Sequence, residues 1–204
     1  MESVYIIGIL LFGYLVGSIP FGLLLGRAVG KDVRQEGSGN IGATNVSRLL
    51  GKKLGLLTLV ADTGKAIVPM LLARWFLNVS QVSASIDLWV VLTGASAFLG
   101  HLFPIYLKFK GGKGVATALG VFLLVEPWTV LISLGIFAGV VSTSGYVSLG
   151  SITAAALLPI WVWLIGHSTL NTALALFAAL FIWIKHYSNI VRLMKGGEKS
   201  WKKD

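Results

Sequence analysis

Long stretches without charged residues constrain this chain more than any other feature. Residues 3–26 contain no Asp, Glu, Lys or Arg, and neither do the 58 residues from 127 to 184. A transmembrane helix needs about 20 consecutive apolar residues. At about 1.5 Å per residue, the longer stretch would make nearly three crossings of a bilayer core about 30 Å thick. The stretches predict an all-α, polytopic integral membrane protein.

The remaining composition excludes several other classes of protein. Only 12 % of the 204 residues are charged, against about 25 % in a soluble domain. The net charge of +9 fits the excess of cations on the cytoplasmic side of membrane proteins, so we expect no nucleic acid as a partner. Cysteine is absent and the three His lack neighbouring ligands at metal spacing, so we expect no metal and no cofactor. Because Met1-Glu2 opens the chain without a basic region, no cleavable signal peptide is predicted.

Seven apolar segments follow from the positions of charges and turn residues. Pro20 is expected to kink the first segment, and Glu126-Pro127 to separate the fourth from the fifth. The fourth segment has twelve residues and spans only about 18 Å as a helix. The predicted single membrane domain, 1–204, has helices at approximately 3–26, 54–77, 88–107, 114–125, 127–143, 147–166 and 169–186.

The distribution of cations predicts the topology. Fifteen of the 17 Lys and Arg lie in or beside three polar segments, 27–53, 108–114 and 186–198, and in the tail that ends at Lys202 and Lys203. The positive-inside rule places all of them in the cytoplasm. They share one side only if 114–125 effectively crosses the membrane; otherwise one basic cluster lies outside. We therefore expect seven segments, with the N-terminus outside, the C-terminus inside and the polar segments facing the cytoplasm.

The first polar segment contains a run of small and polar residues. It formally matches the G-x-G-x-x-G pattern, but a predicted transmembrane helix precedes it where the dinucleotide fold needs a strand. Glycines still let successive N–H groups converge on an anion, and an arginine can bind phosphate in bidentate fashion. The alternative is a plain surface loop. The candidate phosphate-binding residues here are Gly37, Ser38, Gly39, Asn40, Gly42, Thr44, Asn45 and Arg48.

Two further polar runs, at 111–114 and 186–192, suggest the same chemistry, and neither contains a carboxylate. Gly111-Gly112-Lys113-Gly114 opens a short helix, whose N-terminus favours anions, although a glycine cap with membrane-anchoring lysines is the alternative. His186, Asn189 and Arg192 recur at spacing three and share one helix face, or form an ordinary interfacial turn. Ser148 and Ser151 complete a phosphate site or cap a helix.

Four ionisable residues were assigned structural roles. Asp62 and Lys65 lie three residues apart within an apolar segment, where ions are functional candidates by default. We interpret them as a structural pair or a link to the polar segments. His101 is interpreted as a hydrogen-bonded structural residue, and Glu198 as a partner for a loop cation.

The three runs, in their longer form, resemble the signature motifs of one family. These are residues 37–45 with Arg48, residues 100–117 and residues 186–198. The chain is similar over almost its whole length to bacterial acyl-phosphate:glycerol-3-phosphate acyltransferases. The resemblance implies transfer of a fatty acyl group from acyl phosphate to the 1-hydroxyl of sn-glycerol 3-phosphate, in the bacterial cell membrane. The products are lysophosphatidic acid and inorganic phosphate, in the first acylation of phospholipid biosynthesis, with no metal and no acyl-CoA.

We interpret the candidate residues in the light of that reaction. Ser38 and the loop backbone would hold one phosphate, Arg48 and Lys113 would neutralise charge, and His186 and Asn189 would orient the glycerol hydroxyl. Two alternatives stay open: a covalent acyl-Ser38 intermediate, and a membrane transporter of an organic phosphate. The His-x4-Asp pair of another acyltransferase class is absent. The oligomeric state is left open, and a monomer suffices for the interpretation.

Overall fold

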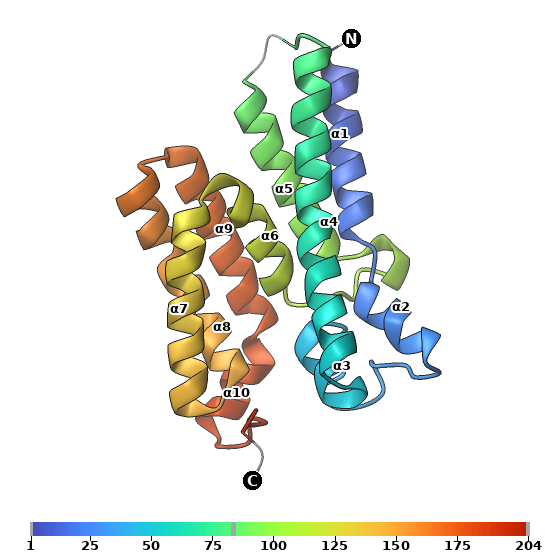
Figure 1. Cartoon of the computed structure of the whole chain (residues 1–204), viewed down its shortest axis with the longest axis vertical. Coiled ribbons are helices and arrows are strands. Elements are labelled where there is room, and N and C mark those ends of the chain that lie inside the picture. Colours follow the sequence, from blue (N-terminus) through green and yellow to red (C-terminus); the bar gives the residue numbers. More distant parts are fainter. Residues whose placement is uncertain (1, 83–84, 203–204) are drawn as a thin grey trace. The chain divides into compact units, whose positions relative to one another are not determined.

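The computed structural model describes residues 2–82 and 85–202, and every regular element in these ranges is helical (Figure 1). Lys203, counted above in the basic tail, lies outside the described residues. The chain forms two compact units, Met1–Leu124 and Val125–Asp204. Each unit is described by itself, and the single domain over 1–204 stays a prediction.

Three long helices pack side by side in the first unit: α1 (Glu2–Gly17), α4 (Lys52–Val79) and α5 (Ile86–Leu102) (Figure 1). Glycines bring α1 and α5 together. A side chain at Gly17 would strike the backbone of Ala97, and one at Gly100 would strike the carbonyl of Tyr14. Small residues at such contacts are typical of helix packing in membranes, where close backbone approach replaces hydrophobic burial.

The kink expected at Pro20 is a break between two helices. α1 ends at Gly17, and α2 (Phe21–Ala28) begins directly after Pro20. Proline has no N–H to donate back to the preceding turn, so it suits a helix start and interrupts a helix interior. Together α1 and α2 still form an apolar stretch long enough to cross a bilayer.

The polar segment 27–53 is more ordered than a simple loop, since it contains α3 (Ala43–Leu50) and the first residues of α4. Gly51, at φ +91°, separates the two helices. The segment predicted over 88–107 corresponds to an apolar stretch at Ile86–Leu107 that contains two helices. α5 stops at Leu102 ahead of Pro104, and the short 3₁₀ helix η1 (Ile105–Leu107) follows.

The second unit consists of α7 (Pro127–Ser144), α8 (Val147–Trp161), α9 (Thr169–Lys185) and α10 (Tyr187–Met194). α8 continues into the π-helical turn η2 (Val162–Gly166), and α9 and α10 meet at a bend of 59°. Figure 1 shows α10 at the end of this unit that holds the C-terminus. At the opposite end Glu126 accepts a hydrogen bond from the Asn171 amide at 2.8 Å.

Five helical stretches of the described chain are long and apolar enough to cross a membrane, and the bent pair α9 and α10 makes a sixth. Large apolar side chains are exposed along them, such as Trp75 at 63 % and Leu180 at 59 %, as lipid-facing positions require. A shorter apolar helix, α6 (Val115–Val125), has 11 residues, or about 17 Å. The predicted seventh crossing depends on α6 and stays a prediction.

Candidate functional site

The first polar run folds around the side chain of Asn45, which is 2 % exposed. Its Oδ1 accepts a hydrogen bond from the Ser38 N–H at 2.8 Å. Its Nδ2 donates to the carbonyls of Val33 at 2.8 Å and Asn40 at 2.9 Å. The Asn45 amide, predicted as a donor to an anion, is therefore engaged by the loop itself, and we assign Asn45 a bracing role in the proposed site.

Glycine is required at two points of the same loop. Gly37 and Gly39 have φ of +66° and +69°, a left-handed conformation that strains residues with a side chain. A side chain at Gly37 would also strike the Asn45 amide oxygen. Asn40 then turns the chain toward α3, because its Oδ1 accepts from the Gly42 N–H at 2.9 Å. The loop conformation is thus fixed by glycines and by two side-chain amides.

The braced loop leads directly into the N-terminus of α3. Gly42 precedes the helix and makes no side-chain cap, and the first N–H groups of a helix have no partner within it. Ser38 is exposed on the loop, and Thr44 is half-buried in the first turn of α3. The half-buried Arg48 side chain makes no hydrogen bond or ion pair with any residue of the described ranges. Exposed donors and an uncompensated guanidinium suit an anion.

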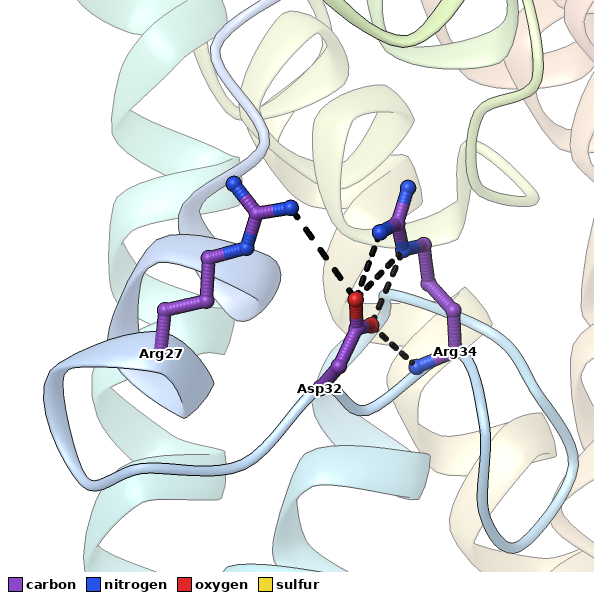
Figure 2. A network of polar contacts seen from close by, with 3 residues as sticks. All are labelled: Arg27, Asp32 and Arg34. Carbon is purple, nitrogen blue, oxygen red and sulfur yellow. Dashed lines mark hydrogen bonds and ion pairs between the residues drawn. The ribbon is translucent and has the colours of Figure 1, made fainter.

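An exposed ion-pair network lies at the start of this segment. Figure 2 shows the side chains of Arg27 and Arg34 reaching Asp32 from opposite sides. Arg34 donates from Nε to Asp32 Oδ1 at 2.9 Å, and Arg27 lies 4.0 Å from Oδ2. The hydrogen bonds from Arg34 hold the pKa of Asp32 well below its ordinary value of 3.8. The only carboxylate in this network is therefore saturated by arginine.

The second polar run, Gly111–Gly114, lies directly on His101 of α5. The Gly112 N–H donates to the His101 carbonyl at 3.0 Å. A side chain at Gly112 would strike the His101 imidazole, and one at Gly111 would strike its carbonyl. Gly114 has φ of +88°. Lys113 is half-buried and stands two residues before α6.

The two runs of the first unit share one apolar core. Leu23, Val33, Ile41 and Val46 are buried together beneath the first loop, and Leu107 of η1 packs against them. Leu107 stands four residues before Gly111. Both candidate phosphate loops are therefore attached to the same packed cluster.

The third run lies in the second unit, where His186 forms the joint between α9 and α10. His186 is 3 % exposed, and its Nδ1 is 2.8 Å from the Ile182 carbonyl. A carbonyl can only accept, so Nδ1 carries a hydrogen. In the neutral ring Nε2 then carries no hydrogen and can accept one. A substrate hydroxyl could therefore donate a hydrogen bond or a proton to Nε2.

Glu198 joins three of the predicted site residues. Its Oε1 accepts from Ser148 Oγ at 2.7 Å and from Asn189 Nδ2 at 2.6 Å, and its Oε2 accepts from Arg192 Nε at 2.7 Å. Burial raises the pKa of Glu198, but these three hydrogen bonds outweigh it and the pKa is lowered. The carboxylate is thus ionised and holds the Asn189 amide and the Arg192 guanidinium in fixed orientations.

The C-terminal tail carries Glu198 into place by binding the turn between α7 and α8. The Trp201 N–H donates to the Gly145 carbonyl at 2.7 Å, and Lys202 Nζ donates to the Thr143 carbonyl at 3.1 Å. Ser148 follows this turn, and its hydroxyl faces the carboxylate. Ser151, by contrast, lies inside α8, and its hydroxyl donates back to the Val147 carbonyl at 2.9 Å.

Sequence reasoning found the members of each cluster but not what organises them. Within the first unit, the structure attaches residues 37–48 and 111–114 to one core. Within the second, it joins Ser148, Asn189 and Arg192. The sequence predicts a loop cation as the partner of Glu198; the structure pairs Glu198 with Arg192 of α10, and also with Ser148 and Asn189, which the sequence does not predict. The available signal was its place in the third motif.

The chain is similar to known proteins over almost its whole length. Residues 7–196 match the glycerol-3-phosphate acyltransferase family. A glycerol-3-phosphate acyltransferase of Desulfotalea psychrophila is 58 % identical over 193 residues, covering 95 % of this chain and 96 % of the relative. One from Geobacter sulfurreducens is 51 % identical over 189 residues, covering 93 % and 94 %.

Solved structures show the same fold. The crystal structure of PlsY, an integral membrane glycerol 3-phosphate acyltransferase, in its glycerol 3-phosphate form superimposes with a TM-score of 0.87 at 38 % identity, covering 97 % of this chain and 96 % of that one. Its lysophosphatidic acid form gives 0.84 at 37 % identity, covering 96 % and 94 %. The fold and the three motifs define an all-helical membrane acyltransferase. The chain belongs to the glycerol-3-phosphate acyltransferase family.

Proposed function

We propose that this acyltransferase takes its acyl group from an acyl phosphate and transfers it to the 1-hydroxyl of sn-glycerol 3-phosphate. The products are lysophosphatidic acid and inorganic phosphate. One observation carries the proposal: the braced loop Gly37–Gly42 leads into the N-terminus of α3, and the last turn of this short helix carries Arg48, whose side chain is uncompensated by the described residues. The related PlsY has been crystallised with glycerol 3-phosphate and with lysophosphatidic acid, which supports this acceptor and this product.

The donor follows from the chemistry that the clusters can supply. Each contains N–H donors and cations, and both substrates of the proposed reaction carry phosphate. An acyl phosphate is already activated, since phosphate is a good leaving group. The protein then has to position the two substrates and stabilise charge, for which fixed donors and cations are sufficient. The proposal needs no metal and no cofactor.

The proposed step is a direct displacement at the acyl carbon. The glycerol 1-hydroxyl oxygen forms the new ester bond, and the bond between the acyl carbon and the bridging phosphate oxygen breaks. The hydroxyl proton passes to a phosphate oxygen, so hydrogen phosphate leaves. Arg48 and Lys113 offset the phosphate charges, while Ser38 and the loop backbone hold one phosphate. His186 and Asn189 orient the hydroxyl, with Asn189 and Arg192 fixed by Glu198.

We further propose the membrane placement expected from the cations. The chain crosses the bacterial cell membrane in seven segments, α6 included, with the N-terminus outside and all three clusters at the cytoplasmic face. The sequence contains no cysteine, so single-cysteine variants report topology without background. A cysteine in place of exposed Asp87 should react with an impermeant maleimide in intact cells. Cysteines in place of Lys52 or Lys199 should react only after the membrane is opened, and reaction of either in intact cells would refute this topology.

Activity of the detergent-purified protein tests the proposed reaction. Palmitoyl phosphate and glycerol 3-phosphate are supplied with EDTA, and palmitoyl-CoA replaces the donor in a parallel sample. We expect equal amounts of phosphate and lysophosphatidic acid from the first sample only. Acylation from palmitoyl-CoA alone would refute the donor, and a requirement for a divalent metal would refute the mechanism. A mass increase of one acyl group on Ser38 during turnover would replace direct displacement with a covalent intermediate.

A further inference from the structure

Three ionisable side chains lie buried together in the first unit, outside the clusters used above. Asp62 and Lys65 come from α4 and His101 from α5, and all three are 2–3 % exposed. Lys65 Nζ is 2.8 Å from Asp62 Oδ1, and His101 Nδ1 is 3.8 Å from the same oxygen. Burying charged groups costs free energy unless they are paired. Three buried ionisable groups therefore suggest a role other than stability.

One end of the group holds the break between α1 and α2. Lys65 Nζ donates to the carbonyl of Ile19 at 3.0 Å, directly before Pro20. Ile19 lies in the break, two residues after α1 ends, and its carbonyl also accepts from the Phe21 N–H at 3.2 Å. α2 then supports the first loop, because Gly22 is so close to the Ile41 carbonyl that any side chain would overlap it. Lys65 thus connects through α2 to the loop that contains Ser38.

The other end of the group supports the second loop. The His101 carbonyl accepts the Gly112 N–H at 3.0 Å. The Nε2 side of the imidazole faces Gly112, since this is the atom that a side chain at Gly112 would strike first, while Nδ1 faces Asp62. The His101 ring therefore lies between the carboxylate of Asp62 and the backbone of the Gly111–Gly114 loop.

We propose that Lys65, Asp62 and His101 are positioning residues that fix the two candidate phosphate loops relative to each other. The inference rests on the proposed function, since it concerns the same site. The Lys65 ammonium makes directional contacts with Asp62 and with the Ile19 carbonyl, and His101 Nδ1 faces Asp62 at 3.8 Å, beyond hydrogen-bond distance. A buried ion pair is often replaceable by apolar residues at little cost in stability, but apolar contacts do not specify the distance from the Ile19 carbonyl to Asp62.

Two variants distinguish a role in positioning the loops from a contribution to the stability of the fold. Lys65→Met leaves Asp62 buried without its partner, and we expect it to lower both the thermal stability and kcat/KM. The double variant D62N/K65M removes both charges, so stability should return to near that of the parent protein. We expect its kcat/KM to remain at least about tenfold low, since small misplacements at a reacting site cost that much or more. Recovery of kcat/KM together with stability would overturn the proposal.

A second measurement does not depend on activity. Spin labels on cysteines that replace exposed Gln35 and Lys110 report the distance between the two loops within the first unit. We expect D62N/K65M to broaden or shift the distance distribution, and His101→Asn, which keeps a nitrogen toward Asp62 but removes the ring beneath Gly112, to do the same. Unchanged distributions in both variants would overturn the proposal.

The exposed pair Arg74–Asp87, at 2.8 Å, provides the matched control. Like D62N/K65M, the variant R74M/D87N removes one cation and one carboxylate, here from α4 and α5. We expect it to keep kcat/KM within about twofold of the parent and the label distances unchanged within error. Inactivity of the parent protein with acyl phosphate and glycerol 3-phosphate would refute the proposed function. The label distances would still decide whether the buried group positions the loops.

Discussion

Replacing Glu198 by Gln removes one charge and leaves the shape of the side chain almost unchanged. The native carboxylate accepts from Ser148, Asn189 and Arg192 at 2.6 to 2.7 Å, and its side chain is only 7 % exposed. Glutamine keeps one acceptor oxygen. If its NH₂ faces Arg192, it opposes the donors of the guanidinium; if it faces Ser148 and Asn189, the Ser148 hydroxyl can turn to accept, but the Asn189 NH₂ opposes it.

The magnitude follows from these bonds. A hydrogen bond to a charged group is worth about 1.5–3 kcal/mol, against about 1 kcal/mol for a neutral pair. In the orientation that keeps the bonds from Ser148 and Asn189, the bond from Arg192 is lost and the other two become bonds to a neutral acceptor. Because the Arg192 side chain is 40 % exposed, water replaces part of the lost bond. We expect a net loss of about 2–3 kcal/mol. If all of it is felt in the transition state, kcat/KM falls by about 30- to 150-fold, since about 1.4 kcal/mol is tenfold.

The assay is the initial rate of lysophosphatidic acid formation at varied glycerol 3-phosphate, with Asp87→Asn as control. Asp87 is an exposed carboxylate paired with Arg74, and losing a surface pair costs at most about 1 kcal/mol. We therefore expect near-parent activity from the control. Activity of Glu198→Gln within threefold of the parent would refute the view that the carboxylate holds Asn189 and Arg192 for catalysis.

The same carboxylate predicts a dependence of stability on pH. Because the pKa of Glu198 is lower in the folded protein than its ordinary value of 4.5, folding is stabilised by its ionised form. This contribution is complete above about pH 4.5 and is lost as the pH falls through the folded value. Thermal unfolding of the parent and of Glu198→Gln should therefore converge on acidification below pH 4.5. A constant difference down to pH 3 would contradict this assignment.

Three further substitutions test the first loop. Asn45→Ala leaves the Ser38 N–H and the Val33 carbonyl without their partner, so thermal and chemical unfolding should show a loss of about 2–4 kcal/mol; unchanged stability would contradict the bracing role. Gly37→Ala forces a side chain to φ +66° against Asn45, at a cost of about 1–2 kcal/mol, and should raise KM for one substrate, as steady-state kinetics would show. Arg48→Lys should raise KM about tenfold through loss of bidentate binding with an unchanged unfolding temperature; a large drop in that temperature would show that Arg48 is structural.

The sequence predicted the helical elements well where charge and turn residues mark their ends. The short segment at 114–125 is observed as α6 over Val115–Val125, and the break at Gly166–Thr169 separates η2 from α9. It did not predict that Pro20 divides the first segment, nor that 27–53 contains α3. Both depend on packing around Pro20 and Gly42 that a hydropathy pattern does not record.

The candidate site was predicted by residue type, but the roles of its members required geometry. Asn45 and Ser38 belong to one polar run, yet only the structure shows that the Asn45 amide donates its hydrogen bonds to carbonyls of the same loop. Glu198 lies nine residues from Asn189, and a tail bound to the α7–α8 turn brings them together. Spacing along a helix identifies residues on a shared face, but it does not identify a partner supplied by a folded tail.

The fate of the bridging oxygen of the donor tests the central claim most directly. Palmitoyl phosphate labelled with ¹⁸O between the acyl carbon and phosphorus is mixed with glycerol 3-phosphate and an excess of purified protein for a single turnover. The account predicts that all of the label leaves in inorganic phosphate, in an amount equal to the lysophosphatidic acid formed, with no acylated protein at any time. Label in free palmitate, or an acyl group on Ser38 that forms before the product, would contradict direct transfer of the acyl group from bound acyl phosphate to the hydroxyl of bound glycerol 3-phosphate.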